Sequence, residues 1–401
     1  MRTLGERCRG KSSLQVAMGR LRLSTDQVVT RMKDMQYQAS PVSSALTARL
    51  LAAEPEFVGL ERISGAAGDG YLRVTAVSAD GQHVVGMFAD PADTLSLSAF
   101  LWTRAGGLQR LGSLNGGRYC SAEGISAYGR VVVGTAEDGA AEGADRAFRW
   151  TRQGGLHDLG TLNYGRYSHA YACSADGLVV VGDAADGAIG HACRGFYWTF
   201  ASGMRSLGVL NGGLTSHACA VSANGRVIAG YADDGAHDNA RRAVRWTEQD
   251  GLRSLGTLNG GHYSTATAIS ADGRTIVGVA SDGHAGEALR AFVWREDSGM
   301  RSLGGLNGGL VSRANAVSAD GAVVVGVASD GEAGNEERGF VWTAEGGMRS
   351  VENWLYEHGL AAAAVPVVQA NGVSADGQLL VGQLDGERAF IASVRPRWLQ
   401  F

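Results

Sequence analysis

The sequence has few cysteines and no long apolar run. Its 5 cysteines are an odd number, form no Cys-x-x-Cys pair and fall at unrelated positions. They therefore predict neither a disulfide framework nor a zinc site. No apolar stretch approaches the roughly 18–20 residues of a transmembrane helix, and residues 1–56 lack the apolar segment of about 7–15 residues that a secretory signal needs. We expect no transmembrane segment, and no signal peptide is legible.

Positive charge and catalytic motifs are also scarce. Residues 1–56 hold 9 Lys+Arg and 5 Asp+Glu, which leaves 36−9=27 against 40−5=35 in the rest, a net charge near −8. Such a region is a poor match for phosphates, so we expect no nucleic-acid partner. The chain has no Gly-x-Ser-x-Gly, no His-Glu-x-x-His, no phosphate loop and no dinucleotide fingerprint. We therefore predict no catalytic residues and no cofactor.

A repeat of 48 residues fills most of the chain. Six tryptophans recur at that interval, and turn glycines keep the same period until a short insertion before Gly377. Fixed self-similarity at this spacing indicates a repeat architecture. Seven copies run from about residue 57 to the end. The periodic tryptophans are Trp102, Trp150, Trp198, Trp246, Trp294 and Trp342.

Each copy contains four short runs of β-branched and aromatic residues separated by Asp-Gly or Gly turns. This pattern is typical of a four-stranded antiparallel meander. Four hairpin-connected strands in about 48 residues favour a propeller blade over a β-solenoid coil, which stacks shorter units. Small residues alternate along the first run of nearly every copy, as strands squeezed at an axis require. We predict an all-β, seven-bladed β-propeller over residues 57–401.

The two ends of the repeat region predict how the ring closes. The last copy stops after the third-strand sequence at residues 388–392, and the repeats begin with an orphan fourth-strand-like piece at residues 57–60. Pairing the two pieces removes exposed strand edges. We therefore expect an N-terminal strand to complete the last blade of a monomer. Residues 1–56 are predicted to be a weakly ordered, irregular or helical extension.

An arginine recurs before the aromatic strand, and an aspartate opens the preceding loop. A feature of nearly every copy usually serves the blade, here as an Arg–Asp ion pair or as Asp accepting N–H bonds in its own turn. The alternative is a ring of charges that grips an anion. The periodic tryptophans are expected to fill the space between blades, with a carbohydrate platform as the alternative. The recurring arginines are Arg146, Arg194, Arg242, Arg290, Arg338 and Arg388.

Functional residues are better sought where the copies differ. Two positions of the first strand vary in polarity, and innermost strands line a propeller's channel, where ligands bind. His169 and His217 come from consecutive copies and are candidates to share a metal or an anion. Two histidines fall short of a zinc set, so we predict no metal. The candidate channel and ligand-binding residues are Arg73, Glu123, His169, Tyr171, His217, Arg313 and Asn315.

The repeat resembles the HAF family of probable extracellular repeats, found in bacterial secreted proteins and in passenger regions of some autotransporters. The resemblance covers about residues 57–393, and its eponymous His-Ala-Phe appears here as Arg-Ala-Phe, Arg-Gly-Phe or Ser-Ala-Phe. It implies an exported or surface-associated protein and supplies no catalytic residues. The motifs that carry it are clearest at residues 290–294 (RAFVW), 303–309 (LGGLNGG), 316–321 (AVSADG) and 323–326 (VVVG).

Three hypotheses on function follow. The first is a non-enzymatic extracellular or cell-surface binding or scaffold protein for a protein or glycan ligand, such as a detached autotransporter passenger. The second is a propeller hydrolase or lyase, which gains if the side chains of Glu123, His169, Tyr171 and His217 converge in a cleft with perturbed pKa values. The third is an intracellular, cytoplasmic interaction hub, which the cysteines and the illegible export signal favour. Fractionation of the native host separates the first from the third.

Overall fold

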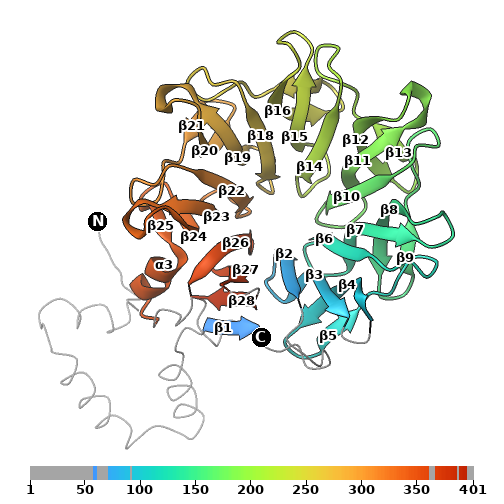
Figure 1. Cartoon of the computed structure of the whole chain (residues 1–401), viewed down its shortest axis with the longest axis horizontal. Coiled ribbons are helices and arrows are strands. Elements are labelled where there is room, and N and C mark those ends of the chain that lie inside the picture. The colour runs from blue at the N-terminus through green and yellow to red at the C-terminus, as the bar shows by residue number, and fades with distance from the viewer. Residues whose placement is uncertain (1–56, 61–70, 91–92, 361–365, 386–387, 395–401) are drawn as a thin grey trace, which may run out of the picture. The chain divides into compact units, whose positions relative to one another are not determined.

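The computed structural model describes residues 57–60, 71–90, 93–360, 366–385 and 388–394. They form seven four-stranded antiparallel sheets arranged in a ring around an axis (Figure 1). The predicted seven-bladed β-propeller is confirmed. The extension predicted over residues 1–56 lies outside the described residues.

Blades 1–6 each consist of four consecutive strands that run from the axis to the rim in chain order. The innermost strands are β2 (Leu72–Val77), β6 (Cys120–Ile125), β10 (Ser168–Cys173), β14 (Ser216–Val221), β18 (Ser264–Ile269) and β22 (Ser312–Val317). The second strands are β3 (His83–Asp90), β7 (Val131–Asp138), β11 (Val180–Asp186), β15 (Ile228–Asp234), β19 (Thr275–Asp282) and β23 (Val323–Asp330). The third strands are β4 (Asp93–Thr103), β8 (Ala144–Thr151), β12 (Ala192–Thr199), β16 (Ala240–Thr247), β20 (Ala288–Arg295) and β24 (Glu336–Thr343). The outermost strands are β5 (Gly107–Arg110), β9 (Gly155–Asp158), β13 (Gly203–Ser206), β17 (Gly251–Ser254), β21 (Gly299–Ser302) and β25 (Gly347–Ser350).

Blade 7 combines the two ends of the repeat region. Its strand order is β1-β28-β27-β26, and β1 pairs antiparallel with β28, with Gly59 opposite Phe390. A local hairpin cannot join residues so far apart in sequence, so this pairing closes the ring and covers an edge of β28. The predicted closure is confirmed. The four strands are β1 (Phe57–Leu60), β26 (Val367–Val373), β27 (Leu379–Leu384) and β28 (Arg388–Ser393).

The insertion between β25 and β26 contains α3 (Val351–Glu357), for which the sequence analysis assigned no structure. The Ser350 side chain caps this helix by accepting a hydrogen bond from the Asn353 N–H at 3.1 Å. The Glu352 carboxylate accepts the N–H of Val367 at 2.8 Å, which ties the helix to β26. Short 3₁₀ turns occur at Gly187–Ile189, Gly283–Ala285 and Gly331–Ala333. Within the described ranges, no helix has the length and apolarity needed to cross a bilayer.

The recurring aromatic side chains pack in or against the core, as predicted. Trp150 and Trp198 are buried, and the partly buried tryptophans are Trp102, Trp246, Trp294 and Trp342. Trp198 is 5% exposed and clusters with Phe196 of its own blade and with Val131 and Val133 of the preceding one. This contact between blades confirms that the aromatic residues fill the space between blades, as expected, and does not favour the alternative of a carbohydrate platform. The phenylalanines that are fully buried in the equivalent way are Phe100, Phe148, Phe196, Phe292, Phe340 and Phe390.

A circle of backbone hydrogen bonds surrounds the axis. The turn after each innermost strand donates an N–H to the same turn of the next blade, as Ala175 does to the carbonyl of Ala223 at 3.0 Å. The circle closes between blades 7 and 1, where Ala375 donates to Ala79 at 2.9 Å. Between blades 1 and 2 the donor is Asp80, at 3.3 Å from the carbonyl oxygen of Ala127. All seven blades are therefore joined through their main chain.

The recurring aspartate and arginine have separate roles. Asp186 accepts the N–H of Ala188 in its own turn at 3.0 Å and the side-chain amide of Asn163 at 2.7 Å. Arg194 donates instead to the carbonyl of Leu214 in the next blade at 2.5 Å. The turn role of the aspartate is confirmed. The alternative Arg–Asp ion pair is wrong for blades 2–6, where the structure describes both side chains and no such pair occurs.

Removing β1 should destabilise the ring. We compare a variant lacking residues 1–50 with one lacking residues 1–62, so that the difference isolates the strand paired with β28. The shorter chain loses a four-residue ladder and should be less stable by about 2–4 kcal/mol in urea unfolding. Equal melting temperatures for the two variants would show that β1 does not hold the ring closed.

The Ser-x-Asp turns should make stability depend on pH. The hydroxyl of Ser270 donates to Asp272 at 2.6 Å and lowers the pKa of that carboxyl. Because the folded-state pKa is depressed, the stabilisation is present above the unfolded pKa of about 4 and is lost as the pH falls through the folded value. Asp272→Asn copies the natural Ser222–Asn224 turn of blade 4. Its unfolding free energy should fall less than that of the wild type between pH 5 and pH 3; an equal fall contradicts this.

Candidate functional site

The second variable position of the innermost strand is a β-bulge. The pairing of β10 with β11 shifts between Ala170 and Ala172, which leaves Tyr171 as the extra residue. In blades 1, 5, 6 and 7 the bulged residue is Thr or Asn, and its side chain donates to a carbonyl on the innermost strand of the next blade. These tethers join Thr75 to Ala122, Thr267 to Ala314, Asn315 to Ala370 and Asn371 to Val74, at 2.6–2.9 Å.

Blades 2–4 do not have this tether. Their bulged residues are Glu123, Tyr171 and Cys219, and no hydrogen bond from these described side chains reaches the next innermost strand in that way. An ionised carboxylate has no proton to donate, and a thiol donates weakly. Each missing bond forgoes about 1 kcal/mol of stability. A local departure from the rule of the repeat marks these three adjacent blades as the place where function is expected.

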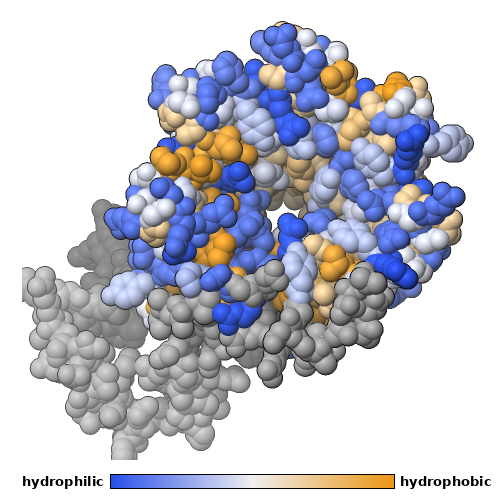
Figure 2. Space-filling view, in the orientation of Figure 1, coloured by the Kyte–Doolittle hydropathy of each residue, from blue (hydrophilic) through white to orange (hydrophobic). Residues whose placement is uncertain are grey.

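A pocket of about 370 Å³ lies where blades 2 and 3 meet. It brings together three of the predicted residues, Glu123, His169 and Tyr171. The other lining residues are Tyr119, Thr135 and Asp145. Figure 2 shows that the ring is open at its centre and that hydrophilic residues border much of the opening. The pocket is polar, with two carboxylates, an imidazole and two phenols.

Glu123 occupies an unusual electrostatic environment. Burial raises the pKa of its carboxyl above the ordinary value, although the hydroxyl of Ser121 and the charges of Arg73 and His169 act in the opposite direction. The Ser121 hydroxyl donates to the carboxylate at 2.5 Å. Burial likewise raises the pKa of Tyr119 and Tyr171. The raised pKa values of Glu123, Tyr119 and Tyr171 mean that the pocket favours the neutral forms of these three groups more than water would.

His169 connects the pocket to a buried carboxylate. Its Nε2 lies 3.4 Å from Oδ2 of Asp145, and its Nδ1 lies 3.5 Å from Oδ2 of Asp183. Burial alone lowers the pKa of His169, but these two carboxylates outweigh burial and raise it. Asp183 is only 3% exposed. Burial acts to raise its pKa, yet the polar groups of His169, His217 and Tyr171 hold it well below its usual range, so the carboxylate is ionised.

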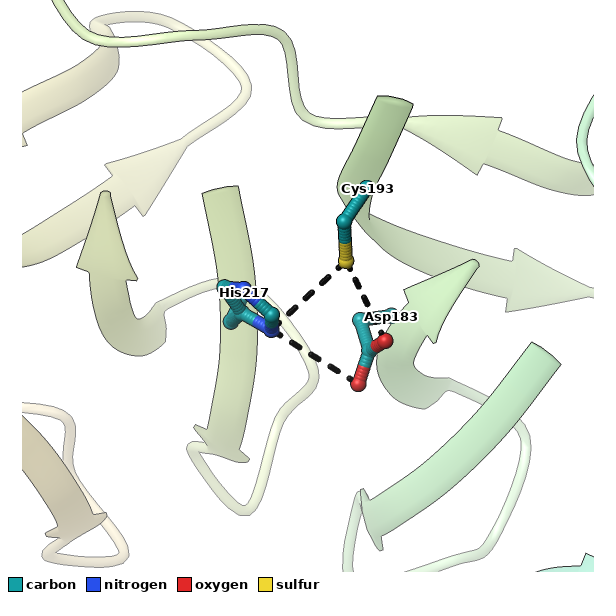
Figure 3. A group of neighbouring side chains, drawn as sticks. All are labelled: Asp183, Cys193 and His217. Carbon is teal, nitrogen blue, oxygen red and sulfur yellow. Dashed lines mark hydrogen bonds and ion pairs between the residues drawn. The ribbon is translucent and has the colours of Figure 1, made fainter. Parts of the chain in front are cut away.

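Two more side chains meet Asp183 from neighbouring strands (Figure 3). The Sγ atom of Cys193 on β12 lies 3.3 Å from Oδ2 of Asp183, and Nδ1 of His217 on β14 lies 3.7 Å from Oδ1. The two donors themselves are 3.7 Å apart. The ring of His217 stacks on Tyr231 with centroids 4.4 Å apart, which fixes its orientation. Burial and the charge of Asp183 raise the pKa of the Cys193 thiol to about 12.

The structure places the seven candidate residues in different parts of the ring. His217 does not line the pocket, and it meets His169 through Asp183; the anion that the two histidines share is this carboxylate. Arg73 acts on Glu123 through its charge. Arg313 is exposed on β22, on the opposite side of the ring (Figure 1). Asn315 lies outside the pocket of blades 2 and 3, and its side-chain amide donates to the carbonyl of Ala370 in a tether between blades.

The sequence analysis missed Asp145, Asp183 and Cys193, although the repeat contained a signal for them. In the same register, other copies carry apolar residues such as Val279 in place of Asp183 and Leu289 in place of Cys193. The pairing of β10 with β11 places Asp183 directly opposite His169. Gly182 permits this close approach, because a Cβ there would lie 1.9 Å from the carbonyl oxygen of His169.

Comparison with known proteins shows the fold class and no family. No family model matches the chain, and no curated protein does. An oligogalacturonate lyase from Vibrio parahaemolyticus superposes with a TM-score of 0.57 at 12% identity, over 86% of this chain and 97% of that one. A putative TolB from Agrobacterium tumefaciens gives 0.45 at 14% identity, over 78% and 98%. TolB from Acinetobacter baumannii gives 0.45 at 13% identity over 68% of this chain, and the match spans only 63% of that TolB.

These findings define the protein as a seven-bladed β-propeller in which two adjacent blades form a polar pocket. At such low identity, the likeness to the lyase shows the fold alone. What the pocket does must come from its own residues.

Glu123 should cost the protein stability at neutral pH. A folded-state pKa above the unfolded value of about 4.3 means that the stabilising form is the protonated one, which is present at low pH and lost as the pH rises through the folded pKa. Glu123→Gln mimics that form and should be more stable than the wild type at pH 7, with the difference shrinking below pH 4. Urea unfolding measures both, and exposed Glu337→Gln is the control. A less stable E123Q protein at pH 7 would refute the assignment.

Proposed function

We propose that this protein is a non-enzymatic β-propeller that works outside the cell or on its surface and binds a neutral, hydroxyl-rich ligand, a glycan, in the pocket of blades 2 and 3. The observation that carries the proposal is the composition of that pocket. Glu123, Asp145, Thr135 and the phenols offer hydrogen-bond acceptors and donors around a volume of about 370 Å³. Tyr119 and Tyr171 add aromatic surface against which a sugar ring packs.

The charges favour a neutral ligand. Each acidic group of the pocket has a basic neighbour, since Arg73 and His169 act on Glu123 and His169 contacts Asp145. Burial also favours the neutral form of Glu123. A polyanion would meet two carboxylates, and its phosphates would find no cluster of cations to neutralise them. Hydroxyl groups match the acceptors without requiring a charge.

The location outside the cell rests on the resemblance of the repeat to HAF proteins. The motifs of that resemblance are the ones that build the blade, namely the aromatic strand, the Asp-Gly turn and the Asn-Gly-Gly crossover. A rigid ring closed on itself also suits a binding protein that must persist in an unprotected environment. Fractionation of the native host tests this part separately, and recovery of the protein in the cytoplasm would reject it.

The second candidate function is an enzyme, and the raised pKa values of Glu123 and His169 in one pocket favour it. We rank it lower because both ring nitrogens of His169 face carboxylates, Asp145 on one side and Asp183 on the other. A general acid or base needs a nitrogen directed at its substrate. Glu123 for its part is held by the hydroxyl of Ser121.

Binding is tested by screening the purified protein on a glycan array and measuring the best ligand by calorimetry. Asp145→Ala should raise the Kd at least tenfold, a loss of about 1.4 kcal/mol. The control is Glu337→Ala, which removes a carboxylate from the equivalent position of blade 6 and should leave the Kd unchanged. Equal effects of the two substitutions, or no glycan binding by the wild type, would refute the proposal. Time-dependent cleavage of the bound glycan would favour the enzyme instead.

A further inference from the structure

We propose that Asp183, Cys193 and His217 form a binding site for one divalent transition-metal ion of the zinc class. The three side chains come from β11, β12 and β14, so the site joins blades 3 and 4. Figure 3 shows that their polar ends point toward one another. Within the described residues, this set places three potential ligand atoms within 4.8 Å of one another. The inference does not depend on the glycan pocket.

The distances between the donor atoms fit a tetrahedral site. Zinc holds sulfur at about 2.3 Å and nitrogen or oxygen at about 2.0–2.1 Å, and a tetrahedral arrangement then puts neighbouring ligand atoms roughly 3.3–3.6 Å apart. The observed separations are 3.3 Å from Sγ to Oδ2 and 3.7 Å from Sγ to Nδ1, whereas Nδ1 lies 3.7 Å from Oδ1, the other oxygen of the carboxylate. With one ligand atom from each residue, the three atoms lie within 4.8 Å of one another. Seating an ion therefore requires the Asp183 carboxylate to turn so that one of its oxygens faces both Cys193 and His217.

Asp183 supplies an independent reason for a cation. Its side chain is 4% exposed, and its Oδ1 atom has no hydrogen-bond partner among the described residues. A buried, ionised carboxylate oxygen without a partner is costly. Nδ1 of His217 faces this oxygen at 3.7 Å, beyond hydrogen-bond length. A metal ion between the Asp183 carboxylate and the His217 ring would give both groups a partner. No hydrogen bond within the cluster gives Oδ1 one.

The donor set selects the class of metal. One sulfur, one imidazole nitrogen and one carboxylate oxygen suit zinc and its first-row neighbours, whereas calcium and magnesium take sets of oxygen ligands. On metal binding the Cys193 thiol would release its proton to solvent, and the resulting thiolate and the Asp183 carboxylate would carry two negative charges that balance a divalent ion. Three protein ligands leave a fourth position for water or another small ligand.

The neighbours of the three ligands support the same assignment. His169 contacts Oδ2 of Asp183 at 3.5 Å and orients this carboxylate from the side of the pocket. Tyr231 stacks on the ring of His217 and holds it in place. Supporting contacts of this kind orient the ligands in metal sites. At the junction of blades 5 and 6 the equivalents of Asp183 and His217 are Val279 and Arg313, which cannot bind a metal together.

Metal content of the full chain tests the proposal directly. Protein that is purified in the presence of zinc and then desalted should contain about one zinc ion per chain, measured by inductively coupled plasma mass spectrometry. Cys193→Ser and His217→Asn should each lower the affinity at least tenfold. Cys173→Ser is the matched control, because Cys173 is a half-buried cysteine of the same blade that lies outside the group. It should retain the metal.

A second measurement needs no variant. Cobalt(II) added to the metal-free wild type should give the visible absorption bands of a four-coordinate ion and a thiolate-to-cobalt charge-transfer band in the near ultraviolet. Zinc should displace the cobalt and abolish both. A wild type that binds neither metal, a cobalt spectrum without the thiolate band, or equal loss of metal in C173S and C193S would overturn the proposal. Circular dichroism of each variant shows whether it folds. If a variant does not fold, the cobalt spectrum of the wild type still tests whether a thiolate binds the metal.

Discussion

Contact between neighbouring blades is the constraint on which the rest of this structure depends. Each blade is a small four-stranded sheet that buries its aromatic residues only against another blade, as Trp198 does against Val131 and Val133. The backbone bonds around the axis and the arginines that donate to the next blade add directional links to this packing. Because the ring has no end, every blade obtains both of its neighbours. The pairing of β1 with β28 completes blade 7 and so closes the ring.

The tethers between innermost strands distinguish blades 2–4 from the rest of the ring. Each innermost strand contains a bulged residue outside the regular strand pairing. In four blades the side chain of this residue donates a hydrogen bond to a carbonyl of the next blade. In blades 2–4 the same position carries Glu123, Tyr171 and Cys219. The remaining contacts around the ring are numerous enough to tolerate these losses. Specialised chemistry therefore collects on one side of a scaffold whose other side keeps to the repeat.

Burial of charge gives that side its properties. His169 stands between two carboxylates, and Asp183 is almost fully removed from water. Such an arrangement is expensive in a marginally stable domain, and a closed ring supplies the rigidity that holds it. The pocket and the proposed metal site share His169 as a boundary, because its two ring nitrogens face Asp145 on one side and Asp183 on the other.

The sequence alone determined the period, the number of blades, the turns and the closing strand, because the tryptophans and turn glycines recur at a fixed interval and the ends of the repeat are complementary. It also indicated Glu123, His169 and Tyr171, since polar variation among small neighbours is visible in one strand. It did not give the insertion helix, the separation of Arg194 from Asp186 or the tether role of Asn315. Asp183 and Cys193 stand out in the sequence as residues at positions that are apolar in blade 5, but nothing there shows which side chains they meet. They lie on different strands from the histidines, and only strand register and the packing of blade 3 on blade 4 bring the side chains together.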